Sequence, residues 1–376
     1  MTRKNSIDII KGMAIILMVY GHTFGVARDF IYLFHMPVFI FISGYCFNSA
    51  HADSLKSCEE YFFSRVRRLI LPYMGFNIVF ALLNNLFIKL NFYTDRLEFK
   101  LAVNPIQKAA QTLMEHRGLK GMFMDVYDVI TLKDIPQMGS ASWFLIVLFT
   151  VCVVHCFVTF FIGKLSNKYV RGILWACIFT CCLIIAYVIS EGAVDTEDFA
   201  MRHLQFFEVY ACYLMGVFAR EYSHLLPTNR VAIGVLGIVA FFGLYSILYS
   251  FGPLEMSKGY IVHPMFLIVV TIHGMVLLAS LAVDLENNKL GEALAFVGKH
   301  TLAILFLHIL AFKLVSVVYC GINGIPAYMT ASWPVLFDVP EWVKLCYTIV
   351  GVLVPLALDC GAKILNNSVK DMIRRK

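Results

Sequence analysis

The sequence predicts an all-α, polytopic transmembrane helix bundle, and three observations lead to this fold class. Hydrophobic residues make up 60% of the 376 residues and charged residues only 15%, against about 45–50% and about 25% in soluble domains. Several apolar runs approach the ~20 residues that cross a membrane as a helix, for example 69–90, 143–162, 231–251 and 260–283. Most Lys and Arg residues lie between such runs. A soluble fold cannot bury this much apolar surface, so the excess is expected to face lipid.

We expect about ten membrane helices. In chain order they cover 6–27, 31–49, 68–90, 142–163, 171–190, 205–222, 230–251, 259–283, 299–321 and 343–365. The first is read as a retained helix, because it contains Lys11 and His22 and a second apolar segment follows at once. No internal repeat is evident, which argues against a transporter built from duplicated halves. The whole chain, 1–376, is expected to form a single membrane domain.

The distribution of Lys and Arg predicts that both termini are cytoplasmic. The segments assigned to the cytoplasm contain Arg3, Lys4, Lys56, Arg65, Arg67, Arg68, Lys164, Lys168, Arg171, Arg220, Arg230, Lys289, Lys299, Lys363, Lys370, Arg374, Arg375 and Lys376. The long connection of about 91–141 then lies outside, where we expect a surface helix and where the loop could act as a lid or acceptor-binding element. Orientation accounts for the net charge of +6, so no nucleic-acid binding is expected.

The 11 cysteines form no CxxC pair and most lie within apolar runs. This pattern is typical of small packing residues in bilayer helices. Neither disulfides nor a metal site are expected.

Two ionisable residues of the first helix are the leading candidates for chemistry, since such groups are costly within a bilayer. Lys11 and His22 are eleven residues apart, which places them within roughly 20° of one helical face and about 16 Å apart along the axis. Lys11 is expected near the cytoplasmic end and His22 near the external end. The alternative is a snorkelling lysine and a hydrogen-bonded core histidine.

Two later segments add candidates at each end of the bundle. His35 opens the second helix, at a depth close to that of His22. Arg65 and Arg68 precede the third helix and are i,i+3 neighbours on a helical face. The positive-inside rule alone would explain these arginines, but guanidinium groups also suit the phosphates of a cytoplasmic donor.

The runs IDIIKGMAIILMVYGH (7–22), FHMPVFIFISGY (34–45) and RVRRLILPY (65–73) together resemble the acyltransferase-3 family of bacterial membrane O-acyltransferases, especially its fucose O-acetylase-like members. Weaker similarity follows at 142–145 and at 302–308. The family signature in the first helix is a basic residue, ten residues and a histidine, and Lys11 to His22 fits it. Many members have arginine there, so the lysine weakens any role that needs a bidentate fork.

The resemblance implies an O-acetyltransferase that moves an acetyl group from acetyl-CoA to a hydroxyl of a cell-surface or lipid-linked glycan. On this hypothesis Arg65 and Arg68 bind the donor phosphates and the thioester arm extends inward past Lys11. His22 is the general base, because imidazole titrates near working pH. His35 orients the acceptor or stabilises the oxyanion, and an acyl-histidine intermediate on His22 or His35 stays open.

Three further residues are candidates for substrate contact. His308 matches the family's late histidine and could line the site. Trp143 could stack on a sugar, although an interfacial anchor is the commoner role. Glu208 could hold an imidazole or a sugar hydroxyl.

The expected location is the inner, cytoplasmic membrane, as a multi-pass protein, and homo-oligomer formation is left open. Two other functions compete with acyl transfer. A transporter or flippase of a glycan precursor would explain Lys11 and His22 but gives no special reason for the arginine pair. A structural subunit of an envelope polysaccharide complex would act only through partners.

Overall fold

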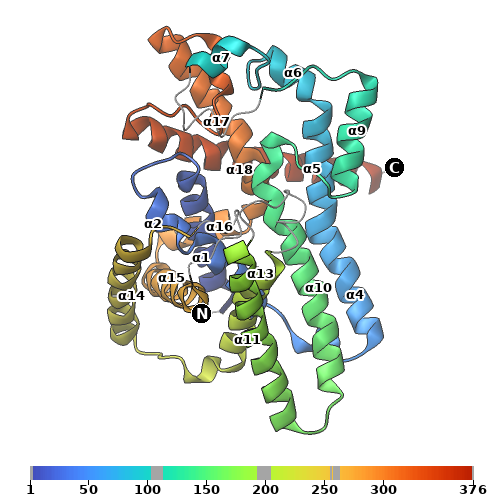
Figure 1. Cartoon of the computed structure of the whole chain (residues 1–376), viewed down its shortest axis with the longest axis vertical. Coiled ribbons are helices and arrows are strands. Elements are labelled where there is room, and N and C mark those ends of the chain that lie inside the picture. Colours follow the sequence, from blue (N-terminus) through green and yellow to red (C-terminus); the bar gives the residue numbers. More distant parts are fainter. Residues whose placement is uncertain (1–2, 103–112, 193–204, 255, 257–262, 375–376) are drawn as a thin grey trace. The chain divides into compact units, whose positions relative to one another are not determined.

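The computed structural model describes residues 3–102, 113–192, 205–254, 256 and 263–374, and every regular element within these ranges is a helix (Figure 1). Six of the described helices are long and apolar enough to cross a membrane. They are α10 (Trp143–Gly163), α11 (Lys168–Gly192), α14 (Arg230–Phe251), α15 (Pro264–Leu285), α17 (Thr301–Asn323) and α18 (Glu341–Arg374). Each overlaps a predicted span, although α18 continues to Arg374, beyond the predicted end at 365. The all-helical membrane fold is therefore confirmed.

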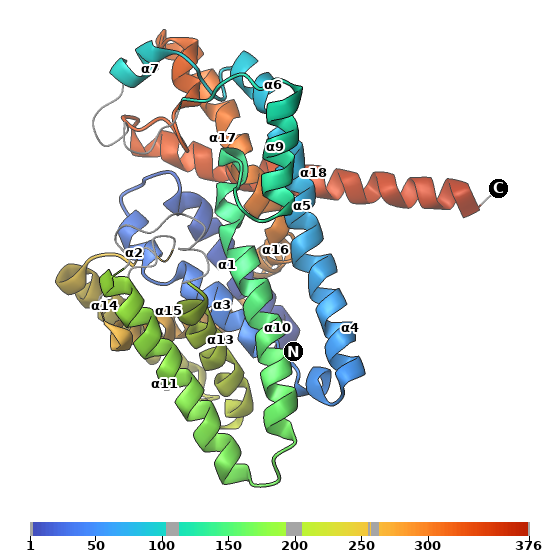
Figure 2. The same ribbon diagram turned by 45° about the vertical axis from the view of Figure 1, so that its right-hand side comes forward.

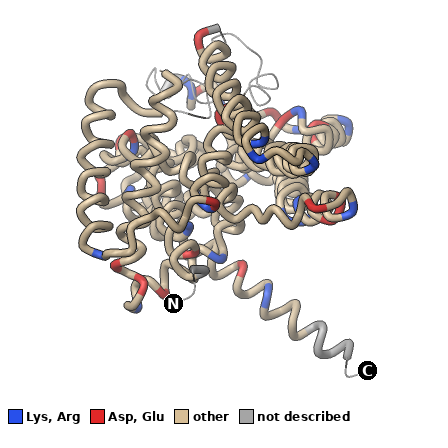
Figure 3. The backbone as a smooth tube through the Cα atoms, turned by 90° about the horizontal axis from the view of Figure 1, so that it is seen from below, with Lys and Arg blue, Asp and Glu red and all other residues tan. Residues whose placement is uncertain are grey.

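The count of ten spans is not confirmed, because the remaining four predicted segments form shorter, broken or more polar helices. They correspond to α1 (Arg3–Gly21), α3 (His35–Tyr45), α5 (Leu71–Leu82) with α6 (Asn84–Lys89), and α13 (Phe206–Glu221). The 11 residues of α3 reach only about 16 Å, roughly half the hydrocarbon thickness. In Figure 3 most of the chain is tan, and the Lys, Arg, Asp and Glu residues gather towards helix ends and connections.

The chain divides into two compact units, each assembled from separated stretches. The first comprises 1–10, 29–75 and 142–292, and the second comprises 11–28, 76–141 and 293–376. The prediction of one membrane domain over 1–376 is not tested by this division. The two units are described separately below.

In the first unit α3 packs closely against α13 because both helices present a glycine at their contact. A Cβ on Gly44 would lie 1.9 Å from the carbonyl oxygen of Tyr213, and one on Gly216 would lie 1.9 Å from that of Phe41. Small residues serve this purpose in membrane helices generally. Around this contact, α10 and α11 pack on α13, and α15 packs on α14 and α3.

The second unit is built on α17 and α18, which pack along each other. The C-terminal part of α18 extends away from the other helices of this unit (Figure 2). Residues 11–21 of α1 approach α16 (Lys289–Gly298) at Gly12, where a Cβ would lie 2.0 Å from the carbonyl oxygen of Leu294. The connection 91–141 contributes α7 (Leu97–Ala102) and α9 (Leu119–Ile130). That one of them lies on the membrane surface remains a prediction.

Candidate active site

The second unit joins two histidines that are 286 residues apart in the sequence. His22 Nδ1 lies 2.9 Å from His308 Nε2, and the two rings are nearly parallel, with centroids 5.0 Å apart. His308 is completely buried in α17, whereas His22 is partly exposed. Both residues were candidates from the sequence, but the sequence did not predict that they contact each other.

The backbone hydrogen bonds of His308, together with its hydrogen bond to His22, determine which nitrogen of each ring carries the proton. His308 Nδ1 lies 2.9 Å from the carbonyl oxygens of Ile304 and Leu305, and since a carbonyl can only accept, Nδ1 is protonated. In a neutral His308, Nε2 is therefore an acceptor, so the hydrogen bond requires His22 Nδ1–H as its donor. A neutral His22 then has its lone pair on Nε2. That atom has the character of a general base.

His22 lies just beyond α1, in a turn that side chains of α18 hold in place. Lys344 Nζ donates to the carbonyl oxygen of Phe24 at 3.0 Å and to Glu341 at 2.7 Å. Phe24 has a positive φ of 56°, a left-handed conformation that is uncommon for a large residue. Its ring packs on Phe337 at 4.6 Å between centroids. These contacts fix the backbone two residues after the candidate base.

Lys11 lies on α1 and is partly buried. Because α1 runs unbroken from Arg3 to Gly21, the rise from Lys11 to His22 is about 16 Å, as expected. Lys11 is thus part of the second unit but is well removed from the histidine pair. Its function remains a prediction.

In the first unit, four basic side chains form a cluster, which we call the basic cluster: Arg65 at the end of α4 (Leu55–Arg65), Arg68 beyond it, Arg220 in the last turn of α13, and His51 of η1 (Ser49–Ala52). Arg220 Nη1 donates to the carbonyl oxygens of Phe47 at 2.6 Å and Tyr45 at 3.4 Å. Partial burial, and then the charges of the three arginines, lower the pKa of His51. Sequence reasoning found Arg65 and Arg68 but missed Arg220 and His51, because only the fold brings α13 and η1 to them.

Arg65 has the environment of an anion-binding side chain. Its guanidinium lies over the Tyr61 ring at 4.7 Å, and its buried Nε has no hydrogen-bond partner among the described residues. A π-helical turn, η2 (Val66–Ile70), follows it in place of the regular α-helix that we assumed. Arg65 is therefore partly buried while Arg68 is exposed. Single π turns of this kind often occur at functional sites.

The other predicted residues belong to the first unit. His35 opens α3, is 6% exposed, and donates from Nδ1 to the carbonyl oxygen of Ile31 at 3.0 Å. Trp143 is the first residue of α10, as predicted, and is partly exposed. Glu208 is 2% exposed in α13, and its Oε2 receives no hydrogen bond from the residues that the structure describes. Their substrate roles remain predictions.

Sequence reasoning overlooked Lys313 of α17, which is completely buried. Its Nζ donates to the carbonyl oxygens of Ser332 at 2.7 Å and Thr330 at 3.1 Å. Lys313 thereby ties α17 to the connection that leads into α18. A lysine within an apolar helical run was the available signal.

A second overlooked group lies where α17 begins. The carboxylate of Asp359 contacts both His300 and the ammonium group of Lys363. The same ammonium lies 3.1 Å from His300 Nδ1. Within the described ranges, no three His, Cys, Asp or Glu residues are placed to hold a metal ion.

Comparison with known proteins gives one match. A family model described as an acyltransferase domain matches residues 4–358, nearly the whole chain. No curated protein and no solved structure shows significant similarity to the chain.

Proposed function

The chain belongs to the acyltransferase-3 family and is a membrane acyltransferase, and we propose that it moves an acetyl group from cytoplasmic acetyl-CoA to a hydroxyl of a cell-surface or lipid-linked glycan. The fucose O-acetylase-like subgroup is the proposed place within the family. The proposed location is the inner membrane of a bacterium, with ten crossings and both termini cytoplasmic.

The observation that carries this proposal is the hydrogen bond from His22 Nδ1 to His308 Nε2. It keeps a lone pair on Nε2 of a histidine that is partly exposed, while the partner ring is buried and bonded to the backbone. Acyl transfer to a hydroxyl needs a base, and an imidazole whose second nitrogen is hydrogen-bonded to another group can serve as that base.

In the proposed reaction, the acceptor hydroxyl oxygen attacks the thioester carbonyl carbon while His22 Nε2 takes the hydroxyl proton. The tetrahedral intermediate then collapses as the C–S bond breaks. The departing sulfur takes the proton back from His22, which leaves the O-acetyl ester and free coenzyme A. His308 accepts the Nδ1–H hydrogen bond of His22 throughout, so the imidazolium that forms is held in one orientation.

The basic cluster is the proposed donor site. Coenzyme A is polyanionic, and Arg65 offers a buried guanidinium N–H that has no hydrogen-bond partner within the described chain. Charge-assisted hydrogen bonds of this type are among the strongest available to phosphates. We assign Arg65, Arg68, Arg220 and His51 to the donor phosphates, and Lys11 to the path of the pantetheine arm.

His35 keeps its proposed role of orienting the acceptor or stabilising the oxyanion, and Trp143 and Glu208 remain proposed acceptor contacts. An acyl-histidine intermediate is the variant mechanism.

The test is transfer from radiolabelled acetyl-CoA by purified protein in lipid nanodiscs, together with mass spectrometry of glycans from cells that carry each variant. His22→Ala should abolish transfer and remove the acetyl unit from the glycans. His273→Ala is a matched control, because His273 is another partly buried histidine that donates to a backbone carbonyl, that of Val269 at 2.8 Å. Wild-type transfer by a folded His22→Ala protein would end the assignment. Glycan movement without any acetyl transfer would indicate a flippase instead.

A further inference from the structure

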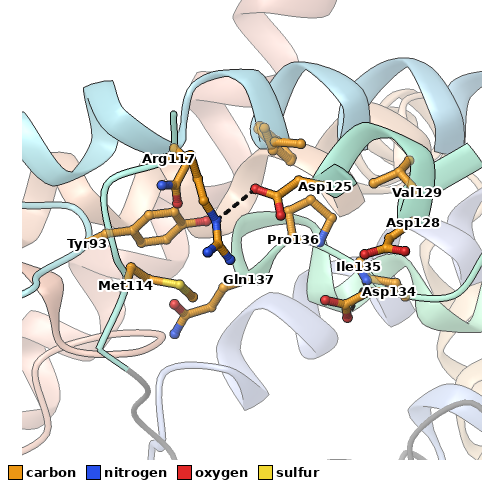
Figure 4. Close-up of a pocket in the computed structure, with 13 residues that line it drawn as sticks. Tyr93, Met114, Arg117, Asp125, Asp128, Val129, Asp134, Ile135, Pro136 and Gln137 are labelled. Atoms are coloured by element: carbon orange, nitrogen blue, oxygen red, sulfur yellow. Dashed lines mark hydrogen bonds and ion pairs between the residues drawn. The ribbon is translucent and has the colours of Figure 1, made fainter. Parts of the chain in front are cut away.

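Residues of α5, α6 and the described part of the connection 91–141 line a pocket in the second unit that the proposed chemistry does not use (Figure 4). It contains about 520 Å³ of empty space, open solvent included. Its lining is Phe80, Ala81, Asn84, Tyr93, Met114, Arg117, Asp125, Asp128, Val129, Asp134, Ile135, Pro136 and Gln137. The lining combines polar and apolar side chains, which favours a ligand with both kinds of surface.

Two buried side chains of this pocket have unused hydrogen-bonding capacity. Asn84 is 8% exposed, and its Nδ2 donates to the carbonyl oxygen of Glu115 at 3.0 Å, but its Oδ1 accepts no hydrogen bond from the described residues. The Tyr93 oxygen accepts from the backbone N–H of Met138 at 3.0 Å, and burial raises the pKa of Tyr93, so its O–H is retained as a donor. One acceptor and one donor therefore line the pocket from its buried side.

The charges at the pocket disfavour an anion. Three carboxylates, Asp125, Asp128 and Asp134, face one guanidinium, that of Arg117, which gives a net charge of −2. Arg117 and Asp125 form an ion pair at 3.1 Å, shown as the dashed line in Figure 4. Asp128 and Asp134 lie together on the opposite side of the view. Carboxylates without a paired cation suit hydroxyl donors and repel a second carboxylate.

Side chains that line the pocket also pack against α17, the helix that carries His308. Phe80 and Tyr93 line the pocket and also belong to a hydrophobic cluster that contains Leu307 and Ile309 of α17. These two residues flank His308 in the sequence. The pocket wall and the histidine pair are thus supported by the same turn of one helix.

We propose that this pocket binds a neutral sugar unit of the acceptor glycan and discriminates against sugars that carry a carboxylate. The proposal rests on the proposed function, which supplies the glycan as acceptor and places the connection 91–141 outside the membrane. Asn84, Tyr93 and Gln137 supply hydrogen-bonding groups to the sugar, while the apolar rim formed by Met114, Ile135 and Pro136 contacts its C–H face. Asp128 and Asp134 determine the charge preference.

The test compares two probes that differ only at one carbon, methyl glucoside and methyl glucuronide, by saturation-transfer NMR on full-length protein in nanodiscs at low salt. Wild-type protein should bind the glucuronide roughly tenfold more weakly, which corresponds to about 1.4 kcal/mol, because the carboxylates of the pocket repel the sugar carboxylate. The double variant Asp128→Asn with Asp134→Asn should bind the two probes about equally. Glu98→Gln removes an exposed carboxylate of α7 outside the pocket and should leave the preference unchanged.

Equal binding of both probes by wild-type protein, no detectable binding of either, or an unchanged preference in a folded double variant would each overturn the proposal. A thermal melt checks folding, and Gln137→Arg provides an independent variant, since an added cation should favour the glucuronide. The proposed function is tested separately by acetyl transfer. Sugar binding without acetyl transfer would refute the proposed function and leave the proposal of a sugar-binding pocket intact. Acetyl transfer with no change of sugar preference in the pocket variants would refute the sugar-binding proposal alone.

Discussion

Removal of the buried partner of the candidate base is the sharpest test of the site. In His308→Leu, His22 Nδ1–H loses the acceptor that lies 2.9 Å away. The tautomer of His22 is then no longer fixed. In the form protonated at Nε2, this nitrogen has no lone pair and cannot take the proton from the glycan hydroxyl. The substitution leaves the basic cluster unchanged, because that cluster belongs to the first unit and shares no residue with the histidine pair.

The expected magnitude follows from the hydrogen bond that is lost. A donor left without its buried partner costs about 1–3 kcal/mol, which corresponds to roughly a 5- to 150-fold change in rate. We therefore expect kcat for acetyl transfer to fall by about 10- to 100-fold, with KM for acetyl-CoA unchanged. His308→Gln should recover part of this loss, because its amide oxygen can accept the same hydrogen bond.

The assay is steady-state transfer from radiolabelled acetyl-CoA in nanodiscs, with His273→Leu as the matched control. The double variant His22→Ala with His308→Leu should be no slower than His22→Ala alone, because a residue that acts only through His22 has no effect once His22 is absent. A wild-type kcat in His308→Leu, or a further loss in the double variant, would refute the reasoning.

Three further predictions concern the first unit. Arg65→Gln should raise KM for acetyl-CoA about tenfold through loss of a charge-assisted hydrogen bond. Arg171→Gln on α11 is the control and should leave KM unchanged. Equal KM values in the two variants would contradict the proposed donor site. Gly216→Ala should destabilise the protein by about 1–3 kcal/mol, because its Cβ would lie 1.9 Å from a backbone oxygen. Gly172→Ala is the control and should not change stability, because a Cβ at Gly172 has open space. Thermal unfolding in detergent measures both effects. His51 has a lowered pKa from partial burial and the neighbouring arginines, so the folded protein binds fewer protons than the unfolded chain below about pH 6.5. Its contribution to stability is complete above that pH and is lost as the pH falls through the lowered value. His51→Gln should flatten the thermal stability profile between pH 7 and 5, and an unaltered profile would argue against this assignment.

The long apolar runs were predictable because length and hydropathy alone specify a membrane helix. The predicted span 230–251 coincides with α14, and 142–163 differs from α10 by one residue. The predicted helix 68–90 was wrong as a single element, because a π turn precedes α5 and a break at Leu83 precedes α6. That break is held by tertiary contacts, since Asn84 and Asn85 bond to the backbone of Glu115 and Arg117. Such contacts leave no periodic signal in the sequence.

The site was predictable as a set of residue types but not as an arrangement. Ionisable groups in an apolar run identified Lys11 and His22, and the family resemblance identified His308. The pairing of the two histidines depends on the packing of residues 286 positions apart. Arg220 and His51 look ordinary in sequence, one at a helix end and the other in a short connection. Their relation to Arg65 follows only from the contacts of α13 with α3 and of η1 with α4.

The two carbonyl contacts of His308 Nδ1 have a consequence for covalent chemistry. With Nδ1–H donated to the backbone and Nε2 occupied by His22, His308 presents no lone pair to an electrophile. Histidine-directed reagents and thioester-mimicking inhibitors should therefore modify His22 and spare its neighbour. If an acylated imidazole forms during turnover, peptide mapping should find it on His22 and not on His308.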